Sequence, residues 1–534
     1  QGKGSTARNL LLFQRLVTLA LYGGMLLFIT TLRADTEDPL VMHNDDNSSS
    51  TVLGSGARSI EDLQQSLVAG DLTSVALVDF FSARINQFDQ AGPTLNSIAH
   101  LNPQARSEAR VLDRERATTG PRSLLHGIPV VVKDNYETEG MPTTAGSQLF
   151  ADYAPQRDAF LVQQLKSAGA LILAKTTMHE FAYGITTVGS GFGATRNPYD
   201  LNRNPGGSSG GTGAAVAANL AVVGMGSDTC GSIRIPAAQN NLFGLRGTQG
   251  LSSRRGIVPL SSTQDIGGPL ARSVRDLAIV LDVTATPDAL DPQTVRETRP
   301  SAPQYLQRLQ LLRSARIGVL QDWFVQEPAD EAVAAVVQDA LRQLAEQAGW
   351  QVQSVASPEL NQALDRAYGG HVVLITDFAH DINRYLQANP ELGYADLDAM
   401  IAANLAHKQV QASLRASANL ARADQRAYQR EFAQRQVVRD AVLTLMQEYE
   451  LEALVYPTIR QVAAPLGQEQ PGTNCRISAN SGLPAISVPA GFTAGGMPVG
   501  LELLAGPWQE QLLLNLAYTV EQLYPQRRRP AATP

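Results

Sequence analysis

The chain has 534 residues, of which 44% are hydrophobic and 17% charged, a composition typical of a globular protein with a sizeable core. Its 43 basic and 50 acidic residues give a net charge of −7, and the scattered basic residues argue against nucleic-acid binding. The two cysteines, Cys230 and Cys475, form no CxxC pair, so we expect neither a structural disulfide nor zinc.

The N-terminal segment, residues 1–34, contains an apolar run from Leu16 to Leu32 that follows several basic residues and ends in Leu-Arg-Ala. This order predicts either a cleaved signal peptide or an uncleaved anchor slightly short for a full membrane span. The protein would then be exported or associated with a membrane, whereas a translation start near Met42 predicts a cytoplasmic one, and both alternatives stay open. Residues 35–58 are polar and predict a disordered linker.

Helix and strand patterns alternate from Ser59 onward, which predicts an α/β domain over residues 59–534. A nearly continuous helical pattern over residues 361–449 interrupts this alternation as an insertion. Before and after it we expect helices over residues 59–67, 74–88, 161–168, 213–220 and 329–348, and strands over residues 128–132, 171–174, 316–320, 351–355, 453–456, 485–488 and 499–504.

The residues suited to catalysis gather in a stretch of glycine and serine over residues 204–238. Its first loop, residues 206–211, reads Gly-Gly-Ser-Ser-Gly-Gly, and glycine allows tight turns because it lacks a Cβ atom. In its second loop, residues 228–232, consecutive N–H groups can converge as an oxyanion hole. We expect Arg234 to pair with Asp228 and hold this second loop in place.

The stretch resembles the signature of the amidase signature family, a family of serine hydrolases. Residues 228–236 read Asp-Thr-Cys-Gly-Ser-Ile-Arg-Ile-Pro, which fits the closing part of the family pattern except that Cys230 replaces a glycine or alanine. Upstream, His-Gly-Ile-Pro-Val-Val-Val-Lys-Asp-Asn over residues 126–135 is similar to the strand that holds the family's catalytic lysine. The resemblance covers the chain from about Ser59 to the C-terminus.

The resemblance implies a mixed, twisted β-sheet wrapped by helices, and an amidohydrolase without cofactor or metal. It implies a catalytic Ser-Ser-Lys triad of Lys133, Ser208 and Ser232, an oxyanion hole made by the amides of Thr229, Cys230, Gly231 and Ser232, and supporting residues Ser209, Asp228 and Arg234. Lysine acts as a base only where burial disfavours its cation, and Lys133 ends an apolar run where burial is expected.

Cys230 has two interpretations. A free cysteine behaves as a small hydrophobe, so we expect Cys230 to pack behind the loop, either at negative φ or with stored strain. The alternative is that its thiol is the nucleophile, which would require a thiolate favoured by nearby positive charge.

The expected substrates are small-molecule amides, with carbamates and esters also possible, for a monomer or homodimer. Aromatic residues that could line the substrate pocket are Phe181, Tyr183, Phe192 and Phe378, and the helical insertion adds Tyr368, Tyr385 and Leu386.

Three alternatives stay open. An amidotransferase-type subunit that delivers ammonia to a partner, or a non-catalytic binding protein, would keep the same motifs. The pattern Gly-x-Ser-x-Gly around Ser208 and Ser209 also fits an α/β-hydrolase esterase. That mechanism requires a downstream histidine, and those available, His371, His380 and His407, all fall within the helical insertion.

Overall fold

The structure is a computed structural model that describes residues 57–534 except 297, 301–303, 368–370 and 424. The expected signal or anchor segment, nearly all of the linker, and Tyr368 lie outside the described residues. Within them, no helix combines the length and the apolar composition that crossing a membrane requires.

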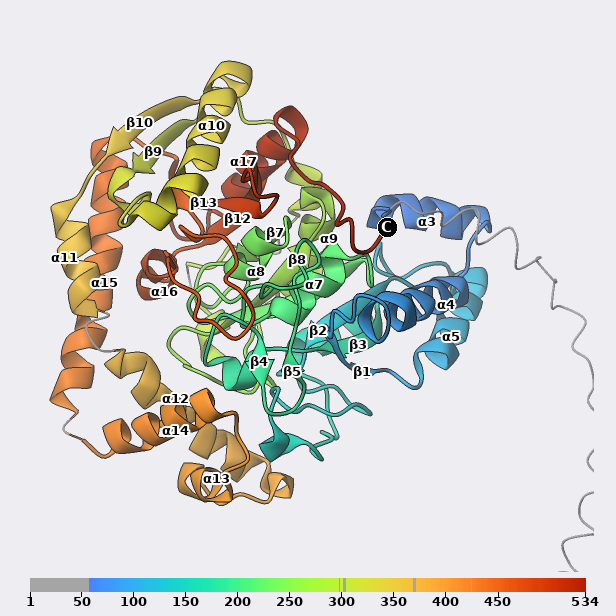
Figure 1. Ribbon diagram of the computed structural model, residues 1–534. Helices are drawn as coiled ribbons and strands as arrows, with labels where there is room; N and C mark the ends of the chain where they lie inside the picture. Colours follow the sequence, from blue (N-terminus) through green and yellow to red (C-terminus); the bar gives the residue numbers. More distant parts are fainter. Residues whose placement is uncertain (1–56, 297, 301–303, 368–370, 424) are drawn as a thin grey trace, which may run out of the picture. The chain divides into compact units, whose positions relative to one another are not determined.

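An 11-stranded mixed sheet forms the centre of the described part (Figure 1). Its strand order is β1-β3-β2-β6-β8-β7-β12-β13-β11-β9-β10, with parallel pairs on both sides of β2 and of β9 and antiparallel pairs from β6 to β11. The α/β class with a mixed sheet, expected from the sequence, is confirmed. The strands are β1 (Ile98–Leu101), β2 (Pro129–Lys133), β3 (Leu171–Thr176), β6 (Val223–Asp228), β7 (Phe243–Arg246), β8 (Ile266–Ala271), β9 (Arg316–Leu320), β10 (Gln351–Val355), β11 (Ala453–Pro457), β12 (Ala485–Phe492) and β13 (Pro498–Leu504), besides the separate pair β4 (Val188–Gly189) and β5 (Gly193–Ala194).

Strand β2 is buried along its whole length. Its run of three valines suits a strand covered on both faces, because β-branched side chains pack well on a pleated surface. The strand begins and ends one residue later than expected and therefore includes Lys133, whose side chain is carried into the protein interior.

Most of the helices pack around this sheet, whereas α12, α13 and α14 form a separate group beside it (Figure 1). The helices are α3 (Ile60–Ala69), α4 (Ser74–Arg84), α5 (Ala105–Thr119), α6 (Phe160–Ser167), α7 (Gly210–Ala217), α8 (Arg234–Gln239), α9 (Val274–Thr284), α10 (Glu331–Ala348), α11 (Pro358–Ala367), α12 (Val372–Ala388), α13 (Leu397–Ala403), α14 (Lys408–Ala421), α15 (Arg426–Glu448), α16 (Arg476–Ser481) and α17 (Glu510–Leu523). The helical insertion expected over residues 361–449 corresponds to α11 to α15.

Helix α7 begins at Gly210, three residues earlier than the sequence suggested, directly after the two serines of the glycine-rich loop. Small residues make this position possible, because a Cβ atom at Gly211 would lie 2.3 Å from the carbonyl oxygen of Thr177. The first turn of α7 therefore packs against the segment that follows β3.

The helical insertion has its own hydrophobic core. Buried side chains of α12, α13 and α14 pack with Phe150, Tyr153 and Phe181, which precede the glycine-rich loop in the sequence. The insertion is thus seated on the segments of the α/β core that lead into the glycine-rich loop.

Candidate active site

Lys133 lies at the carboxyl end of β2 with a fully buried side chain. Its Nζ is 2.7 Å from Oγ of Ser208, 2.8 Å from Oγ of Ser227 and 3.3 Å from the carbonyl oxygen of Ser227. Throughout the described residues, no carboxylate lies within ion-pair distance of this Nζ, so its contacts are neutral oxygens.

The environment of Lys133 favours the neutral amine. Burial lowers the pKa of Lys133 to about 7, although the charges of Asp265 and Asp228 oppose the shift. The unprotonated amine that a lysine base requires is therefore accessible near neutral pH.

A second buried lysine, Lys175 on β3, has a different environment. Its Nζ forms an ion pair with Oδ1 of Asp134 at 3.3 Å and lies 2.9 Å from Oγ1 of Thr143. Burial lowers the pKa of Lys175, while the charge of Asp134 opposes that shift. Asp134 therefore pairs with Lys175 and not with its sequence neighbour Lys133, so of these two lysines Lys133 is the one without a carboxylate partner among the described residues.

The first glycine-rich loop is joined to β6 and to the second loop by hydrogen bonds. The amide of Ser209 donates to the carbonyl oxygen of Ser232 at 3.2 Å, and Ser209 Oγ donates to the carbonyl oxygen of Ser227 at 3.1 Å. The peptide bond between Gly207 and Ser208 is cis. These contacts place Ser208, the partner of Lys133, in the loop that adjoins Ser232.

Asp228 organises the second loop. Its carboxylate accepts hydrogen bonds from the amides of Gly231 (2.8 Å) and Ile233 (3.1 Å), and it forms ion pairs with Arg234 (3.1 Å) and Arg246 (3.0 Å). Burial alone would raise the pKa of Asp228, but the charges of the two arginines outweigh burial and hold the pKa well below its usual range. The expected pairing of Asp228 with Arg234 is confirmed.

Of the four amides expected to form an oxyanion hole, three have no hydrogen-bond acceptor among the described residues. The amide of Gly231 donates to Asp228, which corrects the expectation for that residue. Within the described part of the chain, the amides of Thr229, Cys230 and Ser232 have no acceptor. The left-handed φ of the loop, +90°, falls on Gly231 and not on Cys230, which is therefore free of the strain considered above.

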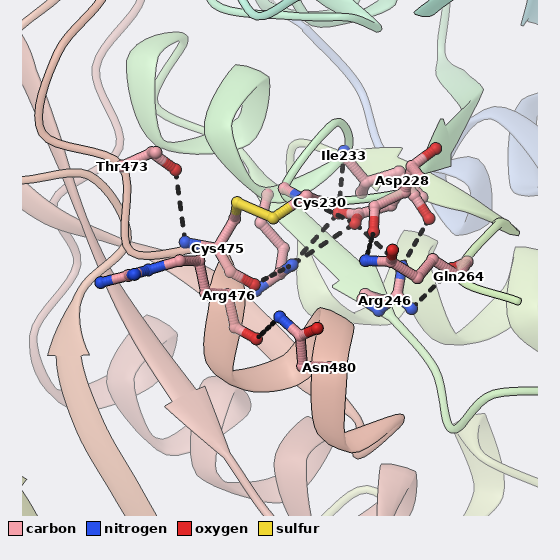
Figure 2. Close-up of a disulfide and its surroundings, with 12 residues drawn as sticks. Asp228, Cys230, Ile233, Arg246, Gln264, Thr473, Cys475, Arg476 and Asn480 are labelled. Atoms are coloured by element: carbon pink, nitrogen blue, oxygen red, sulfur yellow. Dashed lines mark hydrogen bonds and ion pairs between the residues drawn. A yellow bond between two sulfur atoms is a disulfide. The ribbon is translucent and has the colours of Figure 1, made fainter. Parts of the chain in front are cut away.

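A disulfide between Cys230 and Cys475 ties the second loop to the start of α16 (Figure 2). The expectation of unpaired cysteines was wrong, because tertiary folding brings together two residues that lie 245 positions apart. The bond occupies the sulfur of Cys230 and therefore excludes its thiol as a nucleophile in this form. A Cβ atom at Gly231 would lie 2.8 Å from the Cβ of Cys475, so the bridge packs directly against the loop.

Ser232 lines a cavity of about 320 Å³, which we call the first cavity. The Oγ of Ser232 makes no hydrogen bond with any described residue. Thr229 and Cys230 also line this cavity, together with Tyr183, Ile185, Leu260, Leu374 and Ile375. No Asp, Glu, Lys or Arg is among the described residues that line it, and burial lowers the pKa of its histidine, His371, which favours the neutral imidazole, so the wall is uncharged.

The aromatic residues expected in the pocket separate in the structure. Tyr183 lines the first cavity, whereas Phe181 and Phe378 are fully buried beside it in the core of the helical insertion. Phe192 packs edge-on against His100 and does not line the cavity. The expectation for Phe192 was wrong, because this residue lies in the turn between β4 and β5 and its ring contacts His100 on β1.

Among the described residues, histidines make no hydrogen bond to the side chains of the two serines of the Gly-x-Ser-x-Gly pattern. Ser208 Oγ contacts Lys133, and Ser209 Oγ contacts backbone atoms of Ser227. This geometry argues against the α/β-hydrolase alternative. Across the same residues, no group of three His, Cys, Asp or Glu side chains is placed to hold a metal ion.

Two residues of the site were not assigned from the sequence. Ser227 contacts Lys133, and Asp265 accepts a hydrogen bond from Oγ1 of Thr229 at 2.5 Å. Burial raises the pKa of Asp265 to about 6, opposed by hydrogen bonds from Thr229 and from the amides of Leu260 and Ser261. Ser227 could have been identified from the sequence, because it directly precedes the closing part of the signature. Asp265 could not, because no sequence pattern links it to the loop.

Comparisons with known proteins find related sequences and related folds. A family model described as Amidase matches residues 76–514. The crystal structure of native peptide amidase from Stenotrophomonas maltophilia is similar with a TM-score of 0.81 and 35% identity, covering 88% of this chain and 98% of that one. Glutamyl-tRNA(Gln) amidotransferase subunits are also similar, one from Zea mays with 33% identity (88% of this chain, 89% of that protein) and one from Myxococcus xanthus with 34% identity (88% and 98%).

The disulfide generates a prediction about stability. Replacing Cys475 by Ala removes a cross-link over a long loop, which typically stabilises a protein by about 2–4 kcal/mol. We expect a lower melting temperature for Cys475→Ala than for the oxidised wild type by calorimetry, and lower activity because the loop of Ser232 loses its tether.

The control is reduction. Dithiothreitol should lower the melting temperature of the wild type towards that of Cys475→Ala and leave the variant unchanged. A wild type whose melting temperature does not change on reduction, with both thiols then titratable, would contradict a stabilising role for the bridge.

Proposed function

The chain belongs to the amidase signature family and is an enzyme that acts on amide C–N bonds, and we propose that it hydrolyses them through Ser232, Ser208 and Lys133. The observation on which this proposal rests is the 2.7 Å contact between Lys133 Nζ and Ser208 Oγ, made by a buried lysine without a carboxylate partner among the described residues. Such a lysine can accept a proton at neutral pH.

In the proposed reaction, Ser232 Oγ attacks the carbonyl carbon and its proton passes to Ser208, whose own proton passes to Lys133. The amides of Thr229, Cys230 and Ser232 stabilise the oxyanion of the tetrahedral intermediate. The C–N bond then breaks as the same route returns a proton to the leaving nitrogen. Water hydrolyses the remaining acyl-serine ester, which yields a carboxylic acid and regenerates Ser232.

The first cavity has an uncharged wall, so it suits a substrate whose acyl group is uncharged and partly apolar. Burying an unpaired charge there would cost several kcal/mol, because no described side chain of opposite formal charge lines the wall. Aliphatic and aryl amides are therefore the proposed substrates, with carbamates and esters as further acyl donors.

A second candidate function is that of an amidotransferase subunit. The glutamyl-tRNA(Gln) amidotransferase relatives match 87–88% of this chain, which favours this candidate. Its ammonia donor would be an amide such as glutamine, whose α-ammonium and α-carboxylate groups need charged partners. The first cavity offers none among the described residues, so we favour hydrolysis by the chain alone.

The decisive experiment compares amides with the purified chain and no partner protein. We expect hydrolysis of hexanamide, measured as ammonia release, and much slower hydrolysis of glutamine. Glutaminase activity that exceeds hexanamide hydrolysis, or activity that requires an added partner, would favour the amidotransferase candidate instead.

The nucleophile can be identified by covalent labelling. A fluorophosphonate should add to Ser232, because an activated serine beside an oxyanion hole attacks phosphorus as it attacks a carbonyl carbon. Peptide mapping by mass spectrometry locates the adduct, and Ser232→Ala should remain unlabelled. An adduct at Ser208 or Ser209 in the wild type would assign the nucleophile differently.

The base can be tested by mutation and pH. Lys133→Ala should lower kcat by on the order of 10²–10⁴, the usual contribution of general acid–base catalysis. Because the neutral amine is the reactive form and its pKa is about 7, kcat/KM of the wild type should fall as the pH drops through 7. EDTA should leave the activity unchanged.

Two variants separate Lys133 from other titrating groups. Asp265→Asn removes a carboxylate whose negative charge raises the pKa of Lys133, so the activity loss at low pH should persist in that variant with its midpoint moved to lower pH. Lys175→Ala removes the other buried lysine, which should reduce thermal stability and leave the pH midpoint in place. Full activity in Lys133→Ala, or an activity of Asp265→Asn that no longer depends on pH between 5 and 8, would reject Lys133 as the base.

A further inference from the structure

A second cavity of about 420 Å³ adjoins the first. The two share Ala182, Thr229 and Leu260 as lining residues, so they meet at the loop that precedes Ser232. Ser232 lines only the first cavity, whereas Asn135 and Ser227 line only the second. The second cavity therefore reaches Ser227, which contacts the base, and Asn135, which donates to Ser227, and does not reach the nucleophile itself.

Two polar residues, Ser227 and Asn135, line the second cavity next to Lys133. Ser227 Oγ is 2.8 Å from Lys133 Nζ and accepts a hydrogen bond from Nδ2 of Asn135 at 3.0 Å. Asn135 is only 2% exposed, and its Oδ1 has no partner among the described residues. The hydrogen bond from Asn135 fixes the hydroxyl of Ser227, a lining residue of the second cavity that contacts Lys133.

The wall of the second cavity is charged, unlike that of the first. Arg157 pairs with the buried Glu137, and Arg254 pairs with Asp291. Arg384 has a 74% exposed side chain, and the carboxylate of Asp381 lies 3.6 Å from it. Because this contact is too long for a hydrogen bond, Arg384 can still donate to an anionic group of a ligand.

The size of the second cavity argues against ammonia as its occupant. A molecule the size of water takes roughly 30 Å³ in the liquid, so a cavity of about 420 Å³ is more than ten times too large for it. The volume falls in the range of pockets that hold whole small molecules.

From these contacts we propose that the second cavity binds the amine side of the substrate, so that the enzyme cleaves N-substituted amides whose leaving amine bears a polar or anionic substituent. The inference rests on the proposed hydrolysis. The leaving nitrogen must face the proton route of Lys133 and Ser208, and Asn135 and Ser227 beside that route line the second cavity. The acyl group stays on Ser232 in the first cavity, and the departing amine faces Ser227 and the charged wall of the second cavity.

Two alanines on helices of the insertion provide a matched pair of variants. Ala388 on α12 lines only the second cavity, and Ala416 on α14 lines only the first. Phenylalanine at Ala416, which is half-buried, narrows the first cavity, and phenylalanine at Ala388, which is exposed, adds bulk at the opening of the second cavity. Neither residue belongs to the proposed catalytic machinery, so both variants should retain the fold and be labelled by a fluorophosphonate.

The test uses two substrates with one acyl group, hexanamide and N-hexanoyl-4-aminobenzoate. We expect Ala388→Phe to lower kcat/KM for the aminobenzoate by about tenfold or more, mainly by raising KM. For hexanamide, kcat/KM of the variant should stay within about threefold of the wild-type value. Ala416→Phe should slow both substrates by similar factors. Arg384→Gln should lower kcat/KM for the aminobenzoate more than kcat/KM for N-hexanoylaniline, because N-hexanoylaniline lacks the carboxylate.

Equal losses on both substrates in Ala388→Phe would overturn the inference, because the second cavity would then serve water or ammonia. Hydrolysis of hexanamide alone by the wild type would also overturn it, and both results would leave the proposed hydrolysis intact. Absence of hydrolysis of every amide would instead contradict the proposed function itself.

Discussion

The buried carboxylate of Asp228 is the interaction on which the geometry of the site depends. One side chain binds two loop amides and two arginines, and Arg234 extends the network to Glu502 on β13. A buried ion cluster of this kind adds little stability by itself, but removal of one member leaves an uncompensated charge. The network therefore favours one conformation of the loop, the conformation in which the amides of Thr229, Cys230 and Ser232 have no acceptor among the described residues.

The same sheet holds two buried lysines whose pKa values are governed by different partners. Lys175 lies beside the carboxylate of Asp134, whose charge opposes the effect of burial. Lys133 contacts only neutral oxygens among the described residues, so burial prevails and its pKa falls to about 7. Position in the sheet alone does not make a lysine a base, since the absence of a contacting carboxylate matters as much as burial.

Helix α7 links the site to the far side of the α/β core. Its N-terminus begins directly after Ser208 and Ser209, and carbonyl groups at its C-terminal end accept hydrogen bonds from two buried arginines. Arg84 donates to the carbonyl oxygens of Ala218 and Asn219, and Arg272 donates to those of Val216 and Ala221. Cations at this end complement the helix dipole, so these arginines stabilise the helix that positions the loop.

Local sequence patterns were sufficient to predict the α/β class, most strands and the helical insertion. They also predicted the pairing of Asp228 with Arg234, because these two residues lie only six positions apart. Burial and hydrophobic periodicity can likewise be recognised within short segments of sequence. The resemblance added the candidate roles of Lys133, Ser208 and Ser232, which remain a proposal.

Only the tertiary structure revealed contacts between distant segments: the bridge from Cys230 to Cys475, the bond from Thr229 to Asp265, and the engagement of the Gly231 amide. It also separated the aromatic residues, placing Tyr183 at the cavity and Phe192 away from it. A pattern records which residue types follow one another, whereas these contacts depend on where the sheet and the insertion bring remote residues together.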